Sequence, residues 1–210
     1  MRLALGPLAT VFSQALSYPT LEDPNVPTVL VPLAPGCEEL EAVTVIDLLR
    51  RAGISVVTAG LDREQVRASR GVVLVPDTDL ETALQRDYDM VVLPGGLPGA
   101  DHLDSDPRIR TLLLRMAESG RFTAAICAAP KVLASAGLLA GRQATGYPGV
   151  LDALGLTDTT LSSEPVVTDG KVITSRGPGT AMDFALTLIE ELVGKEKRDE
   201  VEAKLVRPGK

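Results

Sequence analysis

Aromatic residues are scarce in this chain, which has no tryptophan, three tyrosines and three phenylalanines among 210 residues. Its core must therefore be built from Val, Leu, Ile and Ala, the mixture typical of buried parallel strands and their covering helices. Two cysteines in a chain of this length do not make a disulfide framework, which favours a reducing, cytoplasmic location. The single histidine, His102, and cysteines in two different loops offer no ligand cluster, so we expect neither a metal nor another cofactor.

Other absences narrow the class of protein further. No apolar run approaches the roughly 20 residues needed to span a bilayer, so we expect no membrane segment. The net charge of −7 argues against specific nucleic-acid binding, because phosphate contacts depend on clustered Lys and Arg. Residues 1–27 are predicted to be an N-terminal extension, an extra helix or a leader for an organelle or export, because one basic and no acidic residue precede a Pro-rich stretch. Residues 28–210 are then one domain.

Strand and helix patterns alternate along residues 28–210 with short connections. Thr28–Leu33 and Ile54–Ala59 read as buried strands around a helix in which Leu40, Val43, Ile46 and Leu49 share one face. Further apolar strands end at Leu93 and at Ile126, and Asp169-Gly170 predicts a hairpin near the C-terminus. This order predicts an α/β fold, a flavodoxin-like three-layer sandwich around a mostly parallel sheet.

The segment Thr123–Pro130 has the layout of a strand-to-helix turn with a nucleophile at its tip. An apolar run stops at Cys127, and small residues follow it at once. A thiol held at a helix N-terminus ionises more easily than a free one, so Cys127 is a candidate reactive thiolate. The alternative is that Cys127 is a small buried hydrophobe, as most cysteines are.

Loops that follow parallel strands gather at one edge of a sheet, which brings Glu41, Gly95, Gly96 and Cys127 together. A protonated carboxyl beside the thiol donates a hydrogen bond to it, and this arrangement raises the carboxyl pKa and lowers the thiol pKa. Glu41 is therefore the candidate acid/base. The alternative is a first-turn carboxylate that only complements the helix dipole.

A second cysteine, Cys37, lies in the loop that leads to Glu41. We consider that it resolves a sulfenic acid on Cys127 as a disulfide. The alternative is a small loop residue too distant to react, which a Cα separation beyond about 7 Å would establish.

Five separated motifs occur in order: APGCEELEAVTVIDLLRRAGI, VVLPGG, AAICAAP, ATGYP and SRGPGTAMDFAL. Together they resemble the ThiJ/PfpI superfamily, in the branch of the bacterial YajL proteins and the human parkinsonism-associated protein. The resemblance implies a homodimer, an oxidation-sensitive nucleophile at Cys127 and a hydrogen-bonded carboxyl at Glu41. It implies an oxyanion or anion pocket lined by the N–H groups of Gly95, Gly96 and Ala128 and bordered by two arginines, Arg51 and Arg70, one of them across the dimer interface. Surface charge is the alternative role for these arginines.

One departure from the wider superfamily limits the chemistry. Many members place a histidine beside the cysteine, whereas this chain has Tyr147 there, as YajL-like proteins have an aromatic residue. Without a Cys–His pair, histidine-assisted peptide hydrolysis loses its support.

The function implied is a deglycase or glyoxalase III-like hydrolase or lyase that needs no cofactor. It acts on methylglyoxal, glyoxal or their early adducts on protein and nucleotide groups. The alternative is a non-catalytic sensor of oxidative stress and redox chaperone that uses oxidation of Cys127.

Overall fold

The computed structural model describes residues 25–208. The predicted N-terminal extension, residues 1–27, lies outside the described residues except for its last three. The central sheet has seven strands in the spatial order β5-β2-β1-β6-β7-β11-β10. In chain order these strands are β1 (Thr28–Leu33), β2 (Ser55–Gly60), β5 (Thr78–Asp79), β6 (Met90–Leu93), β7 (Phe122–Ile126), β10 (Val166–Asp169) and β11 (Val172–Ser175).

Every neighbouring pair in this sheet is parallel except β10 and β11, which form the predicted hairpin. Two short pairs lie outside it, antiparallel β3 (Val66–Arg67) with β4 (Val73–Leu74) and parallel β8 (Gln143–Ala144) with β9 (Thr160–Leu161). The helices are α1 (Glu39–Arg51), α2 (Leu80–Ala83), α3 (Gly99–Ser105), α4 (Pro107–Glu118), α5 (Pro130–Ser135), α6 (Ala181–Val193) and α7 (Lys195–Lys204), with two short 3₁₀ turns, η1 (Asp152–Leu154) and η2 (Pro178–Thr180).

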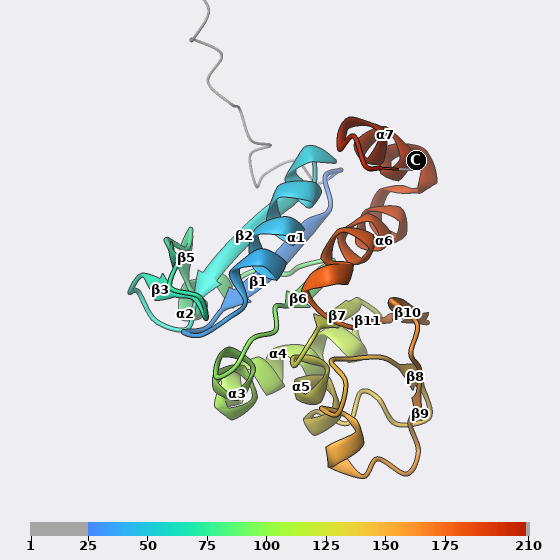
Figure 1. The fold of residues 1–210 in the computed structure, drawn as a ribbon. Coiled ribbons are helices and arrows are strands. Elements are labelled where there is room, and N and C mark those ends of the chain that lie inside the picture. The colour runs from blue at the N-terminus through green and yellow to red at the C-terminus, as the bar shows by residue number, and fades with distance from the viewer. Residues whose placement is uncertain (1–24, 209–210) are drawn as a thin grey trace, which may run out of the picture.

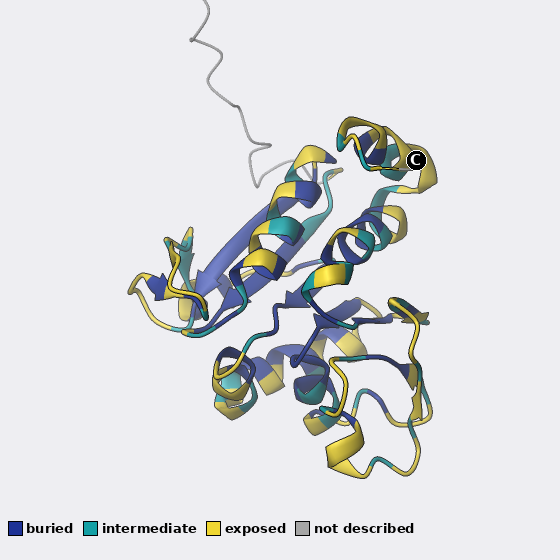
Figure 2. Ribbon diagram, in the orientation of Figure 1, coloured by how far each residue is buried: buried dark blue, intermediate teal, exposed yellow. Residues whose placement is uncertain are grey.

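Apolar residues of the strands pack on both faces of the sheet, and Figure 2 shows the central strands buried throughout. One hydrophobic cluster joins the sheet to α1, α6 and Val201 of α7, and the other joins it to α2, α4 and α5. The fold is therefore an α/β sandwich of three layers, and the predicted fold class is confirmed. No helix among residues 25–208 is long and apolar enough to cross a membrane.

The buried face of α1 differs from the predicted one. Leu40 and Val43 are about half exposed, at 50% and 46%, whereas Ala42, Val45 and Leu48 are buried. The prediction holds for Leu49, which is buried, and for Ile46, which packs against the core. It was wrong for Leu40 and Val43, because α1 also buries Glu41, so its inward face includes a carboxyl that a purely apolar pattern leaves out. The stripe through Leu40 and Val43 is left on the surface.

Candidate active site

Three strands of the sheet end at the same place. β1, β6 and β7 are adjacent, and Figure 1 shows them side by side at the centre of the molecule. The loop after β1 leads into α1, β6 is followed by Pro94-Gly95-Gly96, and β7 ends directly at Cys127. Strand order reverses between β1 and β6, and the crevice beyond the carboxyl ends at such a reversal is where α/β proteins bind ligands.

Cys127 has an unusual backbone conformation for a residue with a side chain. Its φ is +64°, in the left-handed region, while its N–H donates to the Ser175 carbonyl at 2.9 Å and its carbonyl accepts from Tyr147 N–H at 2.7 Å. Such a conformation costs about 1–3 kcal/mol and persists only where surrounding contacts fix it. The turn thereby points the Cys127 side chain, 9% exposed, out of the strand direction and into the crevice.

The donors that reach the sulfur come from two loops. The N–H groups of Gly96 and Ala128 both form hydrogen bonds to Cys127 that favour the thiolate. α5 begins only at Pro130, so the amides of the turn, rather than those of the helix, stabilise negative charge on the sulfur. Gly95 permits this approach, because a Cβ there would lie 2.5 Å from Cys127 Cβ and 2.7 Å from Glu41 Oε2.

The Glu41 carboxyl is buried beside the thiol. Its Oε2 accepts a hydrogen bond from Gly95 N–H at 2.9 Å, whereas its Oε1 accepts none from any described group. Burial raises the pKa of Glu41 to about 7, although its hydrogen bonds with Cys127 and Gly95 act in the opposite direction. The oxygen without a donor is the natural place for a proton, so Glu41 is suited to hold one near neutral pH.

The thiol pKa differs from the expected direction. Burial and, next, the charge of the Glu41 carboxylate raise the pKa of Cys127 to about 12, against the lowering effect of the Gly96 N–H. The expected lowering of the thiol pKa applies to a protonated Glu41, whereas a charged Glu41 raises it, because two buried anions repel each other. The two groups titrate as one pair, and a thiolate forms at Cys127 when the remaining proton resides on Glu41.

Tyr147 borders the same crevice. A Cβ on Gly177 would lie 3.3 Å from Tyr147 Cδ2 and 4.0 Å from Cys127 Sγ, so both side chains flank this glycine. The Tyr147 ring is about half exposed.

Cys37 and Cys127 are both free thiols. The Gly95-Gly96 segment touches both of them, because a Cβ on Gly96 would lie 2.7 Å from the Cys37 carbonyl carbon. Cys37 is fully buried, and burial first and Glu39 second raise its pKa to about 12. A resolving role for Cys37 stays a hypothesis.

The structure does not bring the two predicted arginines to the sulfur within one chain. Arg51 lies ten residues along α1 from Glu41, about 15 Å at the rise of an α-helix, and pairs on the surface with Asp47 at 2.6 Å. The backbone N–H of Arg70 donates to Glu39 at 3.0 Å, which holds its loop against the start of α1.

A fourth loop at this edge was missed from the sequence. β11 pairs with β7, so Ser175 and Gly177 lie next to Cys127 although they follow it by some fifty residues. The signal was present in the strand before Arg176-Gly177, whose end falls at the same sheet edge as the other three loops.

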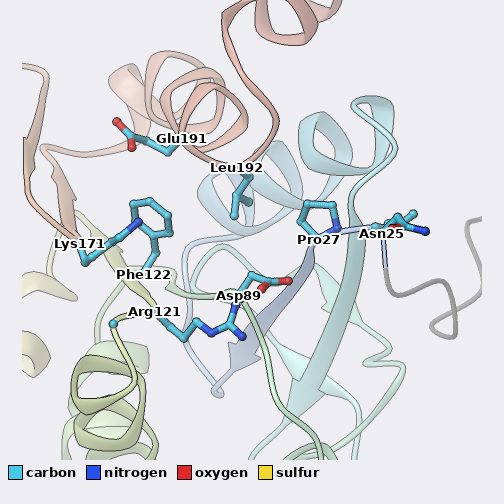
Figure 3. A pocket seen from close by; sticks show the side chains of 10 residues that line it. Asn25, Pro27, Asp89, Arg121, Phe122, Lys171, Glu191 and Leu192 are labelled. Carbon is cyan, nitrogen blue, oxygen red and sulfur yellow. Dashed lines mark hydrogen bonds and ion pairs between the residues drawn. The ribbon is translucent and has the colours of Figure 1, made fainter.

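A cavity of about 290 Å³, separate from the crevice at Cys127, lies at the opposite edge of the sheet, where the strands begin (Figure 3). Both cationic wall residues already have partners, since Arg121 pairs with Asp89, and the Lys171 ammonium stands 3.6 Å from the centre of the Phe122 ring. These contacts link the N-terminal ends of neighbouring strands, β6 with β7 and β7 with β11. Among the residues that the structure describes, no group of three His, Cys, Asp or Glu side chains is placed to hold a metal.

Comparisons with known proteins identify the family of the chain. A model described as the DJ-1/PfpI family matches residues 27–191. The protein named Protein DJ-1 homolog A of Arabidopsis thaliana is 45% identical over 184 residues, 86% of this chain and 47% of that protein, so the chain spans about half of its length. A Caenorhabditis elegans protein named glutathione-independent glyoxalase DJR-1.2 is 39% identical over 160 residues, 76% of this chain and 85% of that protein.

The fold has solved counterparts as well. The crystal structure of Drosophila melanogaster DJ-1beta matches with a TM-score of 0.83 and 45% sequence identity, and the match covers 86% of this chain and 98% of that one.

Proposed function

Because the chain belongs to the DJ-1/PfpI family, we propose that it is a glyoxalase-type enzyme that uses no cofactor. Its substrates are methylglyoxal, glyoxal and related 2-oxoaldehydes, and their early adducts on protein or nucleotide groups. The observation that carries the proposal is the pairing of Cys127 with a buried Glu41 whose pKa is raised to about 7. Similarity to a protein named as a glyoxalase supports the reaction class.

The reaction balances without an external oxidant. The Cys127 thiolate adds to the aldehyde carbon and gives a hemithioacetal, whose oxyanion takes the proton held by Glu41. Transfer of the remaining aldehyde hydrogen, as a proton, from that carbon to the ketone carbon oxidises the first to a thioester and reduces the second to an alcohol. Water then hydrolyses the thioester, so that methylglyoxal plus water gives lactate and one proton, and the thiol is restored.

Each group in the site has a role in one of these reaction steps. The N–H groups of Gly96 and Ala128 stabilise negative charge on the sulfur before attack. Glu41 accepts and returns protons because its pKa lies close to neutral pH, where general acid–base catalysis is most efficient. Gly95 N–H holds the carboxyl in place through Oε2, which leaves Oε1 to carry the moving proton.

The test is lactate formation from methylglyoxal by wild type, Cys127→Ala and Glu41→Gln, with Glu118→Gln, an exposed change on α4, as matched control. We expect no turnover with Cys127→Ala and a fall of about 10²–10⁴ in kcat with Glu41→Gln. Wild-type turnover in Glu41→Gln would exclude Glu41 as the proton carrier. Turnover in Cys127→Ala would exclude the covalent route.

A second candidate function, a redox sensor and chaperone, is favoured by one feature of the same site. Amide donors from Gly96 and Ala128 and a protonated Glu41 would also hold the oxygens of an oxidised Cys127. Peroxide-dependent protection of a client protein by the wild type but not by Cys127→Ala, with no lactate formed, would favour the sensor.

We also propose that the chain is a homodimer through the exposed face of α1. Leu40 and Val43 lie on this face, and Glu39 fixes the neighbouring loop through Arg70 N–H at 3.0 Å and Val72 N–H at 3.3 Å. Val72 and Val73 are 50% and 43% exposed, which enlarges the apolar surface. In such a dimer Arg51 and Arg70 lie at the interface rather than in the site of their own chain.

A further inference from the structure

Another cavity, of about 520 Å³, adjoins the crevice that contains Cys127, on the far side of Tyr147. Its walls come from the end of β8 and the segment after it, from the end of β9 and the two residues after it, and from Arg176, which directly follows β11. The polar wall residues that matter here are Thr145, Tyr147, Ser162, Ser163 and Arg176. Figure 1 shows β8 and β9 at the same end of the molecule as α5, which follows Cys127.

This cavity shares its wall with the reactive site. Tyr147 lines the cavity, donates its N–H to the Cys127 carbonyl at 2.7 Å, and places its ring across Gly177 from the sulfur. Arg176, another wall residue, precedes Gly177 directly, and consecutive Cα atoms are about 3.8 Å apart. A molecule bound covalently to Cys127 therefore needs only a short spacer to place a second group in the cavity.

One wall residue points to a ligand. Thr145 is 1% exposed, and its hydroxyl has no hydrogen-bond partner among the described residues, although its backbone N–H donates to Thr174 Oγ1 at 2.9 Å. A hydroxyl buried without a partner lowers the stability of the folded chain. Valine has the same shape without this cost, so the hydroxyl is explained if it binds something that enters the cavity.

The charge on the cavity wall indicates which kind of ligand group the cavity would bind. Arg176 Nη1 donates to the Ser163 carbonyl at 2.7 Å, and this bond fixes a guanidinium that has further N–H groups. A guanidinium beside hydroxyl donors is the usual recognition pattern for a carboxylate. Asp152, the acidic wall residue, accepts from Gly149 N–H at 3.1 Å, so the side of the cavity at Arg176 is the one that suits an anion.

We propose that the cavity lined by Thr145, Tyr147 and Arg176 binds the carboxylate of a 2-oxoaldehyde that carries an acid group on a short carbon chain, while its aldehyde reacts at Cys127. The proposal rests on the proposed function and names its substrate class. One example is 4,5-dioxopentanoate, which the same internal oxidation and reduction, followed by hydrolysis, converts to 2-hydroxyglutarate. The isosteric uncharged comparison is 5-methyl-2-oxohexanal, in which an isopropyl group replaces the carboxylate.

The first test measures binding without turnover. Calorimetry on Cys127→Ala compares 2-hydroxyglutarate with 2-hydroxy-5-methylhexanoate, the product of the uncharged analogue. We expect the diacid to bind about tenfold more tightly, because a charge-assisted hydrogen bond to Arg176 is available only to it. Adding Arg176→Gln, which keeps a donor for Ser163, is expected to abolish this preference, whereas adding Arg110→Gln, an exposed change on α4, is expected to keep it. Equal affinities, or a preference that survives Arg176→Gln, would overturn the proposal.

The second test separates a binding role of Thr145 from a structural one. Thr145→Val is expected to raise Tm by about 2–4 °C, since it removes an unpartnered buried hydroxyl, and to lower the ratio of kcat/KM for 4,5-dioxopentanoate over 5-methyl-2-oxohexanal severalfold. A variant with higher Tm and an unchanged ratio would contradict a ligand for this hydroxyl. If wild type turns over neither aldehyde, the proposed function fails, and the calorimetric comparison still decides whether the cavity selects a carboxylate.

Discussion

At the scale of single residues, Cys127 and Glu41 are two acids buried side by side, and each affects the protonation of the other. Burial favours the neutral form of each group, and a charge on either raises the pKa of the other. The left-handed φ of Cys127 aims its sulfur at this carboxyl and at the amides of Gly96 and Ala128. The reactivity of the Cys127 sulfur thus depends on whether Glu41 or the thiol is protonated, so the coupled pair is best tested by varying the pH.

Glu41 is expected to make stability fall with rising pH. Its pKa is raised from an ordinary 4.5 to about 7 in the folded chain. The folded state therefore binds more protons than the unfolded state between these values, and the stability present below pH 4.5 is lost as pH rises through 7. Relative to Glu41→Gln, the free energy of unfolding of the wild type should fall by at most about 3 kcal/mol over this range.

Denaturant unfolding of both proteins from pH 4 to pH 8 checks this expectation, and Glu118→Gln serves as the exposed control that should follow the wild type. A difference between wild type and Glu41→Gln that stays flat, or that grows with pH, would mean that the carboxyl is ionised throughout.

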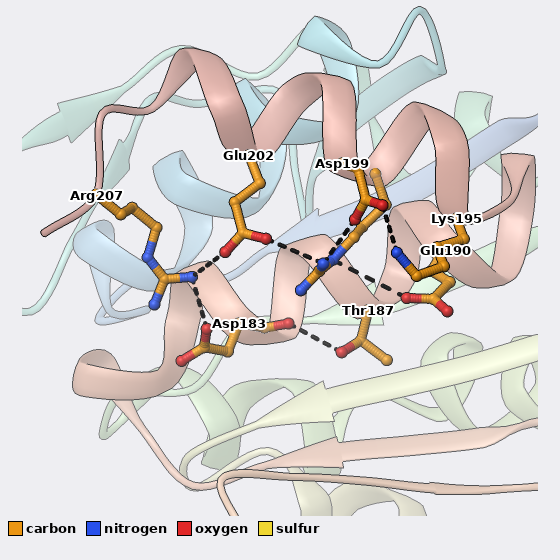
Figure 4. Close-up of polar contacts among 8 residues, drawn as sticks. Asp183, Thr187, Glu190, Lys195, Asp199, Glu202 and Arg207 are labelled. Atoms are coloured by element: carbon orange, nitrogen blue, oxygen red, sulfur yellow. Dashed lines mark hydrogen bonds and ion pairs between the residues drawn. The ribbon is translucent and has the colours of Figure 1, made fainter. Parts of the chain in front are cut away.

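At the scale of elements, α7 is attached to α6 mainly through charges. Of the ten residues of α7 only Val201 and Glu202 are buried. Figure 4 shows Glu202 beside the guanidinium group of Arg207, which also pairs with Asp183 at 2.7 Å. Glu202 pairs with a second guanidinium group, that of Arg198, at 3.0 Å. Glu202 is thus the carboxylate shared by both arginines, in a partly buried place where screening by water is weaker than on an open surface.

Replacing Glu202 with Ala should lower the free energy of unfolding by about 1–2 kcal/mol, because two partly buried guanidinium groups lose a shared acceptor. Glu196→Ala, on the exposed side of the same helix, should change it by less than about 0.5 kcal/mol. Hydrogen exchange would show faster exchange of α7 amides in the first variant. Equal exchange in the two variants would mean that Val201 alone holds the helix in place.

At the scale of the whole molecule, the surface stripe of α1 is the feature that a single chain leaves unexplained. Leu40 and Val43 face outward beside the exposed Val72 and Val73, while Arg51 continues the same helical face. The face is apolar at one end and charged at the other, as expected for a surface that a second copy covers symmetrically.

Changing both Leu40 and Val43 to Asp should convert the proposed dimer to monomers, because two like charges per chain would face each other across a two-fold axis. Sedimentation velocity gives the readout, and Leu154→Asp, at a half-exposed apolar residue elsewhere, is the matched control. A wild-type chain that sediments as a monomer, or a double variant that remains a dimer, would rule out this face as the interface.

The alternation of the main strands and helices, the hairpin at Asp169-Gly170 and the loops that carry Glu41, Gly95 and Cys127 could be predicted from the chain, whereas the short β5 and α3 were not predicted. The reason is that local apolar periodicity fixes the type of each element, and parallel strands must deliver their following loops to one edge. Which face of α1 turns inward could not be predicted this way. Leu40 and Val43 fit an apolar stripe in the sequence, yet the neighbouring Glu41 is the side chain that the fold buries.

The sequence by itself determined the architecture and which residues lie at the sheet edge that carries Cys127, because the local spacing of apolar residues indicates each strand and helix. Only the tertiary structure decided their chemistry. Three features show this: the raised pKa of Cys127, the position of Gly177 beside it, and the buried hydroxyl of Thr145. Each of them depends on residues that are far apart in the chain and that the fold buries together. Burial and charge act through space, and no pattern along the chain measures them.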